Sequence, residues 1–302
     1  MASFGYLVIR GLFGMAEHLA PRLGGRAAFE LFCRTPNPAR LTEKEKRIVE
    51  SARSFMIEAR RHCLTTKFGN VTVHEFRQGS GRSSRPTALV IHGWKSRTEH
   101  MRGVIETLRA EGFRVLAIDL PGHGQSPGRR LHMAAAVAAV HETAKWFGPF
   151  DIIVGHSFGG AVAVNAVAGS VDGVPPIEAG RLVLIAAPSS MPAVFEDFGR
   201  FLGLGPRTQT AVADEVQRIA GHPLEDYVGA VQLAGLAVPA LVIHAPDDKE
   251  VAPRDAEAFA KAGPHVRLFW APGRGHRRII ADPEILAQVR AFATGEPWRI
   301  VA

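Results

Sequence analysis

Short runs of apolar residues alternate with longer amphipathic segments over most of the chain beyond about residue 70. Several of these short runs carry an apolar side chain at every position, as in Leu182–Ala186. Runs of this kind are typical of strands that are buried on both faces, as in a parallel sheet covered by helices. The pattern predicts strands at Val71–Phe76, Ala88–His92, Arg114–Asp119, Asp151–Val154, Leu182–Ala186, Ala240–His244 and Val266–Trp270.

Helical periodicity fills most of the intervals between these strands. An alternation of strands and helices is typical of the α/β class, with a mostly parallel, doubly wound sheet. The helices predicted in this part of the chain cover residues 97–111, 132–147, 158–169, 254–262 and 282–293.

The stretch of residues 189–236 interrupts this alternation because it has no clear strand. It contains two predicted helices, near 193–202 and 207–220, and the first of them is rich in phenylalanine. An insertion at this place lies over the carboxyl edge of the sheet, where α/β proteins bind their ligands. We therefore expect a lid over the site, and the alternative is an insertion without a role there.

The N-terminal residues 1–35 have the pattern of one or two helices, which Pro36 and Pro38 end. Within them, residues 4–20 have the pattern of an amphipathic helix. Arg10 interrupts its apolar stretch, which is too short for a transmembrane helix and unlike a signal peptide. We expect this helix to pack on the protein body, and the alternative is an anchor at a membrane surface.

A charged helix is predicted next, over residues 42–62. Thr42 at its start and Glu45 three residues later have the spacing of a capping box. The polar residues 78–86 then form a turn that precedes the regular alternation. The chain is therefore expected to comprise an N-terminal helical extension, residues 1–65, and an α/β domain, residues 66–302.

The composition is that of an ordinary globular protein. The 302 residues are 46% hydrophobic and 22% charged, enough for a substantial core. The net charge of +7 comes from scattered arginines, and because no basic run alternates with aromatic residues we expect no nucleic-acid partner. Cys33 and Cys63 lie in no motif with zinc-ligand spacing, and we expect neither a metal nor another cofactor. Two cysteines in a chain of this length fit a reducing, cytoplasmic compartment.

The strongest chemical signal is the motif Gly155–Gly159, in which Ser157 is the central residue. It follows the apolar strand residues Ile152–Val154 and precedes a helix of small residues. A G-x-S-x-G motif between a strand and a helix is typical of a nucleophile elbow. The turn exposes the serine Oγ, and the glycines let neighbouring backbone pass close by. We predict that Ser157 is a catalytic nucleophile.

A serine nucleophile needs a general base, and thirteen histidines compete for that role. His276 is favoured because it lies in a glycine-rich turn after the last predicted strand. His244 and His265 flank predicted strands, which favours structural roles for both. His156 belongs to the elbow itself, where its side chain is expected to point away from that of Ser157.

The acid that orients the histidine is expected after the strand that ends at His244. Asp247 and Asp248 are adjacent at this place, and the residues alone do not decide between them. One of them orients His276, and the other belongs to the turn. The order serine, aspartate, histidine along the chain is that of the hydrolases with this elbow.

Two backbone amides are expected to bind the oxyanion of an acyl-transfer reaction, each contributing about 3 kcal/mol. One is the amide of Phe158, directly after the nucleophile. The other is expected in the loop after the strand Ala88–His92, where Gly93 permits a tight turn and Trp94 offers its amide. The alternative for Trp94 is a role as pocket wall only.

Asp119 and His123 lie in the segment Asp119–Ser126, which also contains glycines and a proline. An aspartate and a histidine this close together could form a second acid–base pair. The turn residues between them favour a structural role for both.

Together these motifs resemble the α/β-hydrolase superfamily, in its esterase, lipase and thioesterase-like branch. The resemblance covers about residues 70–296 and leaves residues 1–65 outside. Dehalogenases and epoxide hydrolases of that superfamily carry a carboxylate nucleophile, so Ser157 argues against both. The motifs that carry the resemblance are His92–Trp94, Asp119–Ser126, Gly155–Gly159, Asp247–Pro253 and Gly273–His276.

The resemblance also bears on the choice of the acid. In that superfamily the acid stands three positions beyond a glycine, a position that Ala245 occupies here. Asp248 then falls at the acid position, so the resemblance favours Asp248 over Asp247. The replacement of the glycine by Ala245, and Ala252 between Val251 and Pro253, depart from the pattern of this loop.

The sequence thus predicts hydrolysis of a carboxylic ester or thioester through an acyl-enzyme, by Ser157, His276 and Asp248. The first alternative is an acyltransferase or perhydrolase that uses the same residues. The second is a hydrolase fold that binds ligands without catalysis. The phenylalanine-rich insertion favours a substrate with an apolar group, while the oligomeric state cannot be read from the residues.

Overall fold

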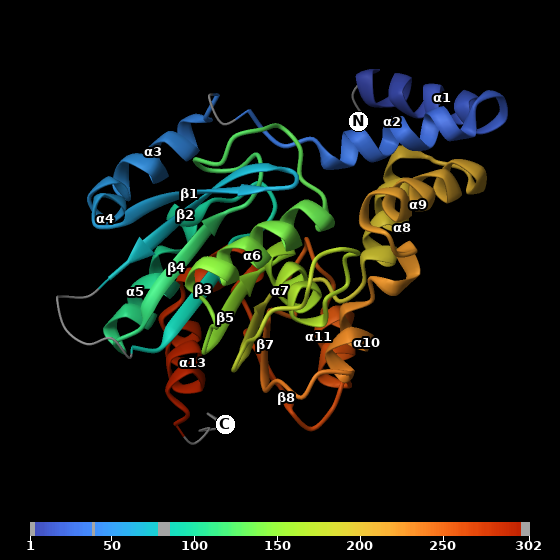
Figure 1. Cartoon of the computed structure of the whole chain (residues 1–302). Coiled ribbons are helices and arrows are strands. Elements are labelled where there is room, and N and C mark those ends of the chain that lie inside the picture. The colour runs from blue at the N-terminus through green and yellow to red at the C-terminus, as the bar shows by residue number, and fades with distance from the viewer. Residues whose placement is uncertain (1–3, 38–39, 78–84, 297–302) are drawn as a thin grey trace.

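A twisted sheet of eight strands forms the centre of the computed structural model, which describes residues 4–37, 40–77 and 85–296 (Figure 1). The strand order is β1-β2-β4-β3-β5-β6-β7-β8. The pairs β1–β2 and β2–β4 are antiparallel and all others are parallel. The strands are β1 Arg60–Thr66, β2 Gly69–Phe76, β3 Thr87–Ile91, β4 Arg114–Asp119, β5 Ile152–His156, β6 Leu182–Ile185, β7 Ala240–His244 and β8 Val266–Trp270.

Helices cover both faces of this sheet. Successive side chains of a strand point to opposite faces, so Leu89 and Ile91 of β3 belong to one core and Ala88 and Val90 to the other. This confirms the predicted α/β architecture. The first core lies under α6 Met133–Phe147, α7 Phe158–Ala168 and α11 Pro253–Ala260, and the second under α5 Arg102–Ala110 and α13 Pro283–Thr294.

The predicted charged helix over 42–62 is wrong in its last part. Its capping box is present, since the Glu45 amide donates to Thr42 Oγ1 over 3.3 Å and the Thr42 amide donates to Glu45 Oε2 over 2.8 Å. The helical residues, however, end at Ile57, and Arg60 begins the strand β1. The helical part consists of α3 Glu43–Ser51 and α4 Arg53–Ile57.

Pairing across the sheet explains this difference. Strand β1 runs antiparallel to β2 in a hairpin that Thr66 and Gly69 close. Leu64 faces the core while its neighbours are exposed, so the segment has the alternation of a half-buried strand. Tertiary pairing therefore overrides the helical propensity of these charged residues. The sheet begins at Arg60, ahead of the boundary that the sequence predicted at residue 66.

The insertion after β6 is helical, as predicted. Helices α8 Met191–Leu202 and α9 Pro206–Ala220 match the two predicted segments, while the short helix α10 Gly229–Ala234 was not predicted. The remaining short elements are the 3₁₀ helices η1 Thr98–Met101, η2 Leu224–Asp226 and η3 Ile279–Ala281, and the helix α12 Gly275–Arg278.

The two N-terminal helices, α1 Phe4–Leu19 and α2 Pro21–Cys33, pack against this insertion (Figure 1). The contact between α2 and α9 is close at Gly25, where an added Cβ would lie 2.8 Å from the backbone carbon of Ala211. Only glycine permits the two helices to approach this closely. Helices α1 and α2 and the insertion thus form one group of helices beside the sheet.

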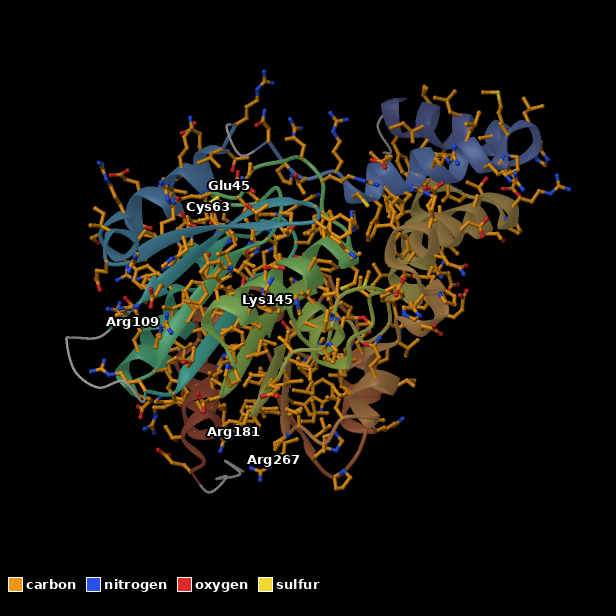
Figure 2. All side chains as sticks on the ribbon, in the orientation of Figure 1. Glu45, Cys63, Arg109, Lys145, Arg181 and Arg267 are labelled. Atoms are coloured by element: carbon orange, nitrogen blue, oxygen red, sulfur yellow. The ribbon has the colours of Figure 1, made fainter. Side chains whose placement is uncertain are left out.

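The two edges of the parallel sheet can be distinguished in Figure 2. Arg181 directly precedes β6 and Arg267 lies near the start of β8, and both are at the lower side of the view. The carboxyl ends of these strands therefore lie at the opposite side, toward α8 and α9. Ser157 directly follows β5 and so lies at that carboxyl edge.

Candidate active site

Ser157 stands in a strained turn between β5 and α7. Its φ of 53° and ψ of −126° lie in a region that residues other than glycine rarely adopt. The Ser157 amide donates to the Ile185 carbonyl over 2.8 Å, which ties the turn to the neighbouring strand β6. An added Cβ on Gly159 would lie 2.6 Å from the His92 carbonyl oxygen, so the motif needs this glycine for close backbone packing.

The imidazole of His276 lies next to the Ser157 hydroxyl. His276 Nε2 is 3.0 Å from Ser157 Oγ, within hydrogen-bond distance. The histidine is the second residue of the short helix α12, which follows β8 at the same edge of the sheet, and its side chain is buried. The structure thus brings together two side chains that are 119 positions apart in the chain.

Asp248 holds the other nitrogen of this imidazole. Its Oδ2 lies 2.8 Å from His276 Nδ1, and its Oδ1 accepts hydrogen bonds from the amides of Glu250 and Val251 over 2.8 and 3.0 Å. Burial acts to raise the pKa of Asp248, but these hydrogen bonds outweigh burial and lower the pKa below its ordinary value. An ionised carboxylate accepts the Nδ1–H of His276, which leaves Nε2 free to accept a proton from Ser157.

Asp247, in contrast, is exposed and contacts a different part of the site. Its Oδ1 accepts a hydrogen bond from the Gly273 amide over 2.7 Å. Gly273 belongs to the turn that precedes His276. Of the two adjacent aspartates, Asp248 therefore reaches the imidazole and Asp247 connects the two loops.

The two amides predicted to bind an oxyanion are near the serine. The loop after β3 passes so close that an added Cβ on Gly93 would lie 2.9 Å from the Cβ of Ser157. Within the described residues, neither the Trp94 amide nor the Phe158 amide donates a backbone hydrogen bond. Both N–H groups are therefore available to a ligand. The Trp94 ring packs edge-on against Phe158, with ring centroids 5.5 Å apart.

Two buried histidines fix the loop that carries Trp94. His92 Nε2 accepts from the Leu120 amide over 3.0 Å, and its Nδ1 donates to the Gly93 carbonyl over 2.7 Å. His123 Nε2 accepts from the Lys95 amide over 3.1 Å. Burial lowers the pKa of both histidines, to about 3 for His92, so both stay neutral and can accept these bonds.

Asp119 lies behind the same loop and is fully buried. It accepts hydrogen bonds from the amide and hydroxyl of Thr98 over 3.0 and 2.9 Å and from His74 Nε2 over 2.9 Å. The hydrogen bonds of Asp119 and His123 hold neighbouring loops, and neither side chain bonds to Ser157 Oγ, which agrees with the structural role predicted for both.

The side chain of His156 contacts the backbone of His276, the candidate general base. Its Nε2 donates to the His276 carbonyl over 2.8 Å. Burial, and then the proximity of His276, lower the pKa of His156 to about 4, so the side chain is neutral near pH 7. Similarly, His244 donates to the Val251 carbonyl and His265 to the Leu233 carbonyl, each over 3.1 Å. None of these three histidines bonds to Ser157.

An apolar pocket lies beside Phe158, and the sequence pointed to only some of the residues that line it. It is narrow, about 20 Å³, which is room for about one water molecule. Phe195 of α8 belongs to the phenylalanine-rich helix of the predicted insertion, but Phe29 and Phe32 belong to α2, in the segment 1–65 outside the resemblance. The ring of Phe32 lies 4.3 Å from that of Phe195. The pocket is lined by Phe29, Phe32, His132, Met133, Ala134, Phe158, Met191, Phe195, Val216, Ile219, Ala220, Leu224 and Tyr227.

Glu250 is a second residue near the site that sequence reasoning did not single out. Its Oε2 lies 3.9 Å from His276 Nε2, while Arg277 binds the same carboxylate with its Nε 2.8 Å from Oε1. The ion pair with Arg277 lowers the pKa of Glu250. In the parts of the chain that the structure describes, no group of three His, Cys, Asp or Glu side chains is placed to hold a metal ion.

Comparison with known proteins defines the family. Residues 88–289, well over half of the chain, match the family described as the Alpha/beta hydrolase family. The chain therefore belongs to the alpha/beta hydrolase family, as the sequence motifs predicted, and is a hydrolase by class. A pimeloyl-(acyl-carrier protein) methyl ester esterase of Stenotrophomonas maltophilia (strain K279a) is 27% identical over 254 residues, covering 68% of this chain and 92% of that protein.

Solved structures agree with this assignment. Est1E from Butyrivibrio proteoclasticus superposes with a TM-score of 0.60 at 18% identity, covering 78% of this chain and 98% of that one. The esterase RhEst1 from Rhodococcus sp. ECU1013 superposes with a TM-score of 0.56 at 19% identity, covering 80% and 100%. At this level of identity the likeness shows that the folds are the same.

Proposed function

We propose that the protein is a serine hydrolase that cleaves a carboxylic ester or thioester through an acyl-enzyme intermediate. The observation that carries this proposal is the unbroken series of hydrogen bonds from Ser157 Oγ to His276 Nε2 and from His276 Nδ1 to Asp248 Oδ2. A serine, a histidine and a carboxylate in this geometry form an activated nucleophile. The similarity to a methyl ester esterase supports an ester substrate.

The mechanism begins with proton transfer from Ser157 to His276 as Oγ attacks the carbonyl carbon of the substrate. Asp248 stabilises the resulting imidazolium and holds its orientation. The unpaired amides of Trp94 and Phe158 donate to the oxyanion. His276 then gives its proton to the leaving alkoxide or thiolate. Water then attacks the acyl carbon and gives its proton to His276, the bond from this carbon to Ser157 Oγ breaks, and His276 returns the proton to Ser157 Oγ.

The pocket beside Phe158 supports an apolar acyl or alcohol group as the part of the substrate that it binds. Its wall is formed almost entirely by aliphatic and aromatic side chains from α2, α6, α8 and α9. At about 20 Å³ it is too narrow for more than one or two methylene groups. We propose that the insertion 189–236 acts as a lid, and that α2 and α8 move apart when a longer chain enters.

Steady-state hydrolysis of p-nitrophenyl butyrate tests this function. Ser157→Ala and His276→Ala are each expected to lower kcat by about 10⁴-fold or more, because both residues belong to one reacting unit. Ser51→Ala, which removes an exposed hydroxyl that donates to the Ile48 carbonyl within α3, is the matched control with nearly unchanged kcat. Equal activity of all four proteins would contradict the proposal.

The same assay separates hydrolysis from acyl transfer. With excess alcohol or peroxide present, a hydrolase releases mainly the free acid, whereas a transferase or perhydrolase releases mainly the new ester or peracid. We expect the free acid to dominate, as measured by mass spectrometry of the products.

A further inference from the structure

Helix α1 presents its apolar side chains outward. Leu12 and Met15 are each 55% exposed, and Leu19 is 83% exposed. Leu7, Val8 and Ile9 are exposed on the preceding turn. Large aliphatic side chains that are clustered and exposed in this way are unusual at the surface of a monomeric globular protein and mark an interaction surface.

The charged side chains of Arg10 and Glu17 on α1, in contrast, point to the protein. Arg10 Nη1 donates to the carbonyls of Arg200 and Phe201 at the end of α8, over 3.1 and 2.8 Å. Glu17 accepts from the amides of Arg207 and Thr208 in the first turn of α9, both over 2.9 Å. A cation therefore caps the end of one helix and a carboxylate the start of another, where the helix dipoles favour them.

The helix packs on the protein body, as the sequence predicted, through buried Phe13 and through the polar contacts of Arg10 and Glu17. It differs from an ordinary surface helix, whose apolar face packs on the core, because most of its large aliphatic side chains are exposed. The aliphatic face of α1, formed by Leu12, Met15 and Leu19, is exposed and can contact a partner outside the protein.

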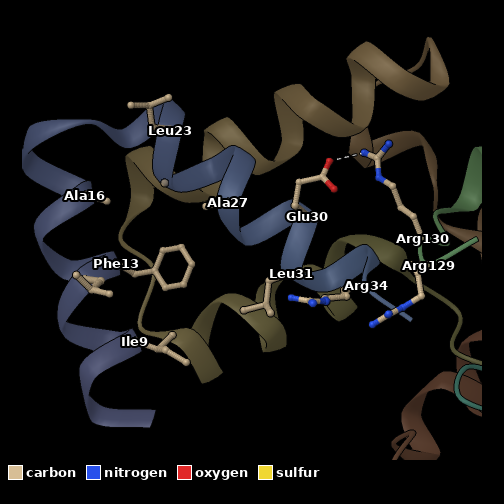
Figure 3. A pocket seen from close by; sticks show the side chains of 12 residues that line it. Ile9, Phe13, Ala16, Leu23, Ala27, Glu30, Leu31, Arg34, Arg129 and Arg130 are labelled. Carbon is tan, nitrogen blue, oxygen red and sulfur yellow. Dashed lines mark hydrogen bonds and ion pairs between the residues drawn. The ribbon is translucent and has the colours of Figure 1, made fainter. Parts of the chain in front are cut away.

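A groove between α1 and α2 extends this apolar surface (Figure 3). Its volume is about 740 Å³, and Ser157 does not line it. The wall is mainly aliphatic, and arginines lie at one end of it. Its lining residues include Ile9, Leu12, Phe13, Leu23, Ala27, Leu31, Arg34, Arg129 and Arg130.

The arginines give this surface a positive rim. Arg130 pairs with Glu30 over 2.6 Å, as Figure 3 shows. Arg34 and Arg129, by contrast, have no ion pair with any residue that the structure describes. Their charge is therefore available to an anionic partner.

We propose that the outer face of α1 and α2 docks on the surface of an anionic phospholipid membrane. An aliphatic face flanked by free arginines matches the acyl chains and the negative headgroups of such a surface. None of the helices in residues 4–37, 40–77 and 85–296 has the length and apolarity needed to cross a bilayer.

The position of α2 gives a second reason to place the outer face of α1 and α2 at a membrane surface. Its outer side carries Leu23 and Leu31, while its inner side carries Phe29 and Phe32, which line the pocket beside Phe158. One helix therefore separates the membrane face from the apolar pocket of the candidate active site. Movement of α2 at the membrane surface would open that pocket toward the lipid.

Vesicle co-sedimentation tests the proposal without reference to catalysis. The full-length protein is expected to bind vesicles of phosphatidylcholine with about 30% phosphatidylglycerol. The double variant Leu12→Glu with Met15→Glu should bind at least about tenfold more weakly, because it places charges on the apolar face. Leu19→Glu with Leu23→Glu tests the same face at its other end.

A matched control uses exposed aliphatic residues elsewhere. Ile57 and Val231 are 75% and 70% exposed and lie outside α1 and α2. Ile57→Glu with Val231→Glu makes the same change in charge and should leave vesicle binding unchanged. Thermal unfolding should show that all these variants are folded. Arg34→Gln with Arg129→Gln should reduce the preference for phosphatidylglycerol over pure phosphatidylcholine by about tenfold or more.

Three outcomes would overturn the proposal. The first is that the wild-type protein does not bind the vesicles. The second is that light scattering finds a dimer that Leu12→Glu with Met15→Glu converts to a monomer, without vesicle binding by either, because the face then joins two copies. The third is saturable binding of a monomeric fatty acid in the groove with no binding to vesicles, because the groove is then a site for a soluble amphiphile.

Discussion

Asp247 and Asp248 are neighbours in the chain, but their carboxylates contact different loops. Asp248 holds the imidazole of His276, whereas Asp247 accepts a hydrogen bond from the Gly273 amide. Chemical type alone could not separate two adjacent aspartates, and only the loop spacing of the resembled superfamily favoured the second. The backbone turn after β7 decides which of them faces the histidine.

Asparagine substitutions test this difference. Asp248→Asn removes the charge that stabilises the His276 imidazolium and should lower kcat by about 10²- to 10⁴-fold. Asp247→Asn keeps a side-chain oxygen that can accept from Gly273 and should change kcat by less than about tenfold. The measurement is kcat for p-nitrophenyl butyrate, and the reverse ranking would assign the catalytic role to Asp247.

At the scale of elements, the strands and helices that carry motifs were the most predictable. The apolar runs of β3 to β7 are buried on both faces, so their sequence alone indicates their structure. The start of β1, Arg60–His62, was predicted as helix, because these residues are polar and their strand structure depends on pairing with β2. Contacts between distant elements, such as α2 with α8, have no local signal.

The packing of α2 on α9 gives one prediction at this scale. Gly25→Ala should destabilise the protein by about 1–3 kcal/mol, because the new methyl group overlaps Ala211. Gly14→Ala in α1 is the matched control, since nothing lies within 4 Å of an added Cβ there. Alanine should then stabilise the helix by up to about 1 kcal/mol. The free energies of unfolding in urea check both signs, and a stabilising Gly25→Ala would contradict the close contact.

Because α2 forms a wall of the pocket beside Phe158, it gives a second prediction at the scale of elements. Phe32→Ala should open the pocket and raise the ratio of kcat/KM for p-nitrophenyl octanoate to that for butyrate, by about fourfold for each extra methylene group accommodated. Leu31→Ala, on the exposed side of the same helix, should leave this ratio unchanged. An unchanged ratio in Phe32→Ala would mean that the acyl chain binds elsewhere.

At the scale of the whole molecule, several histidines are buried in the protein interior and are neutral. Burial is the main cause that lowers the pKa of His92 to about 3 and of His132 and His156 to about 4, against an ordinary value of 6.5. The unfolded chain therefore binds protons between pH 6.5 and 4 that the folded protein does not. The free energy of unfolding should fall as the pH falls through this range, by about 2–3 kcal/mol for each histidine at pH 4.5.

His132→Asn isolates one of these contributions. His132 Nδ1 accepts from the Ala135 amide at the start of α6, and asparagine keeps this N-cap without titrating. The loss of stability between pH 7 and pH 4.5, measured by urea unfolding, should be about 2 kcal/mol smaller in the variant. An equal loss in both proteins would contradict a neutral, buried His132.

The arrangement of the whole chain was less predictable than the local turns that carry the candidate catalytic residues. The elbow of Ser157 and the turn of His276 are local patterns, so the sequence identified both as candidates. The α1–α2 hairpin showed only an amphipathic pattern, which does not reveal which face of a helix contacts the protein. That Arg10 and Glu17 face inward depends on the ends of α8 and α9, about 190 positions away.

The central claim is that Ser157 is the residue that becomes acylated, and labelling with a fluorophosphonate probe tests it most directly. The probe reacts with an activated serine, and peptide mass spectrometry then locates the adduct. We predict a single adduct on Ser157 in the wild-type protein and no labelling in folded Ser157→Ala. An adduct on another serine, or labelling that persists in Ser157→Ala, would contradict the account.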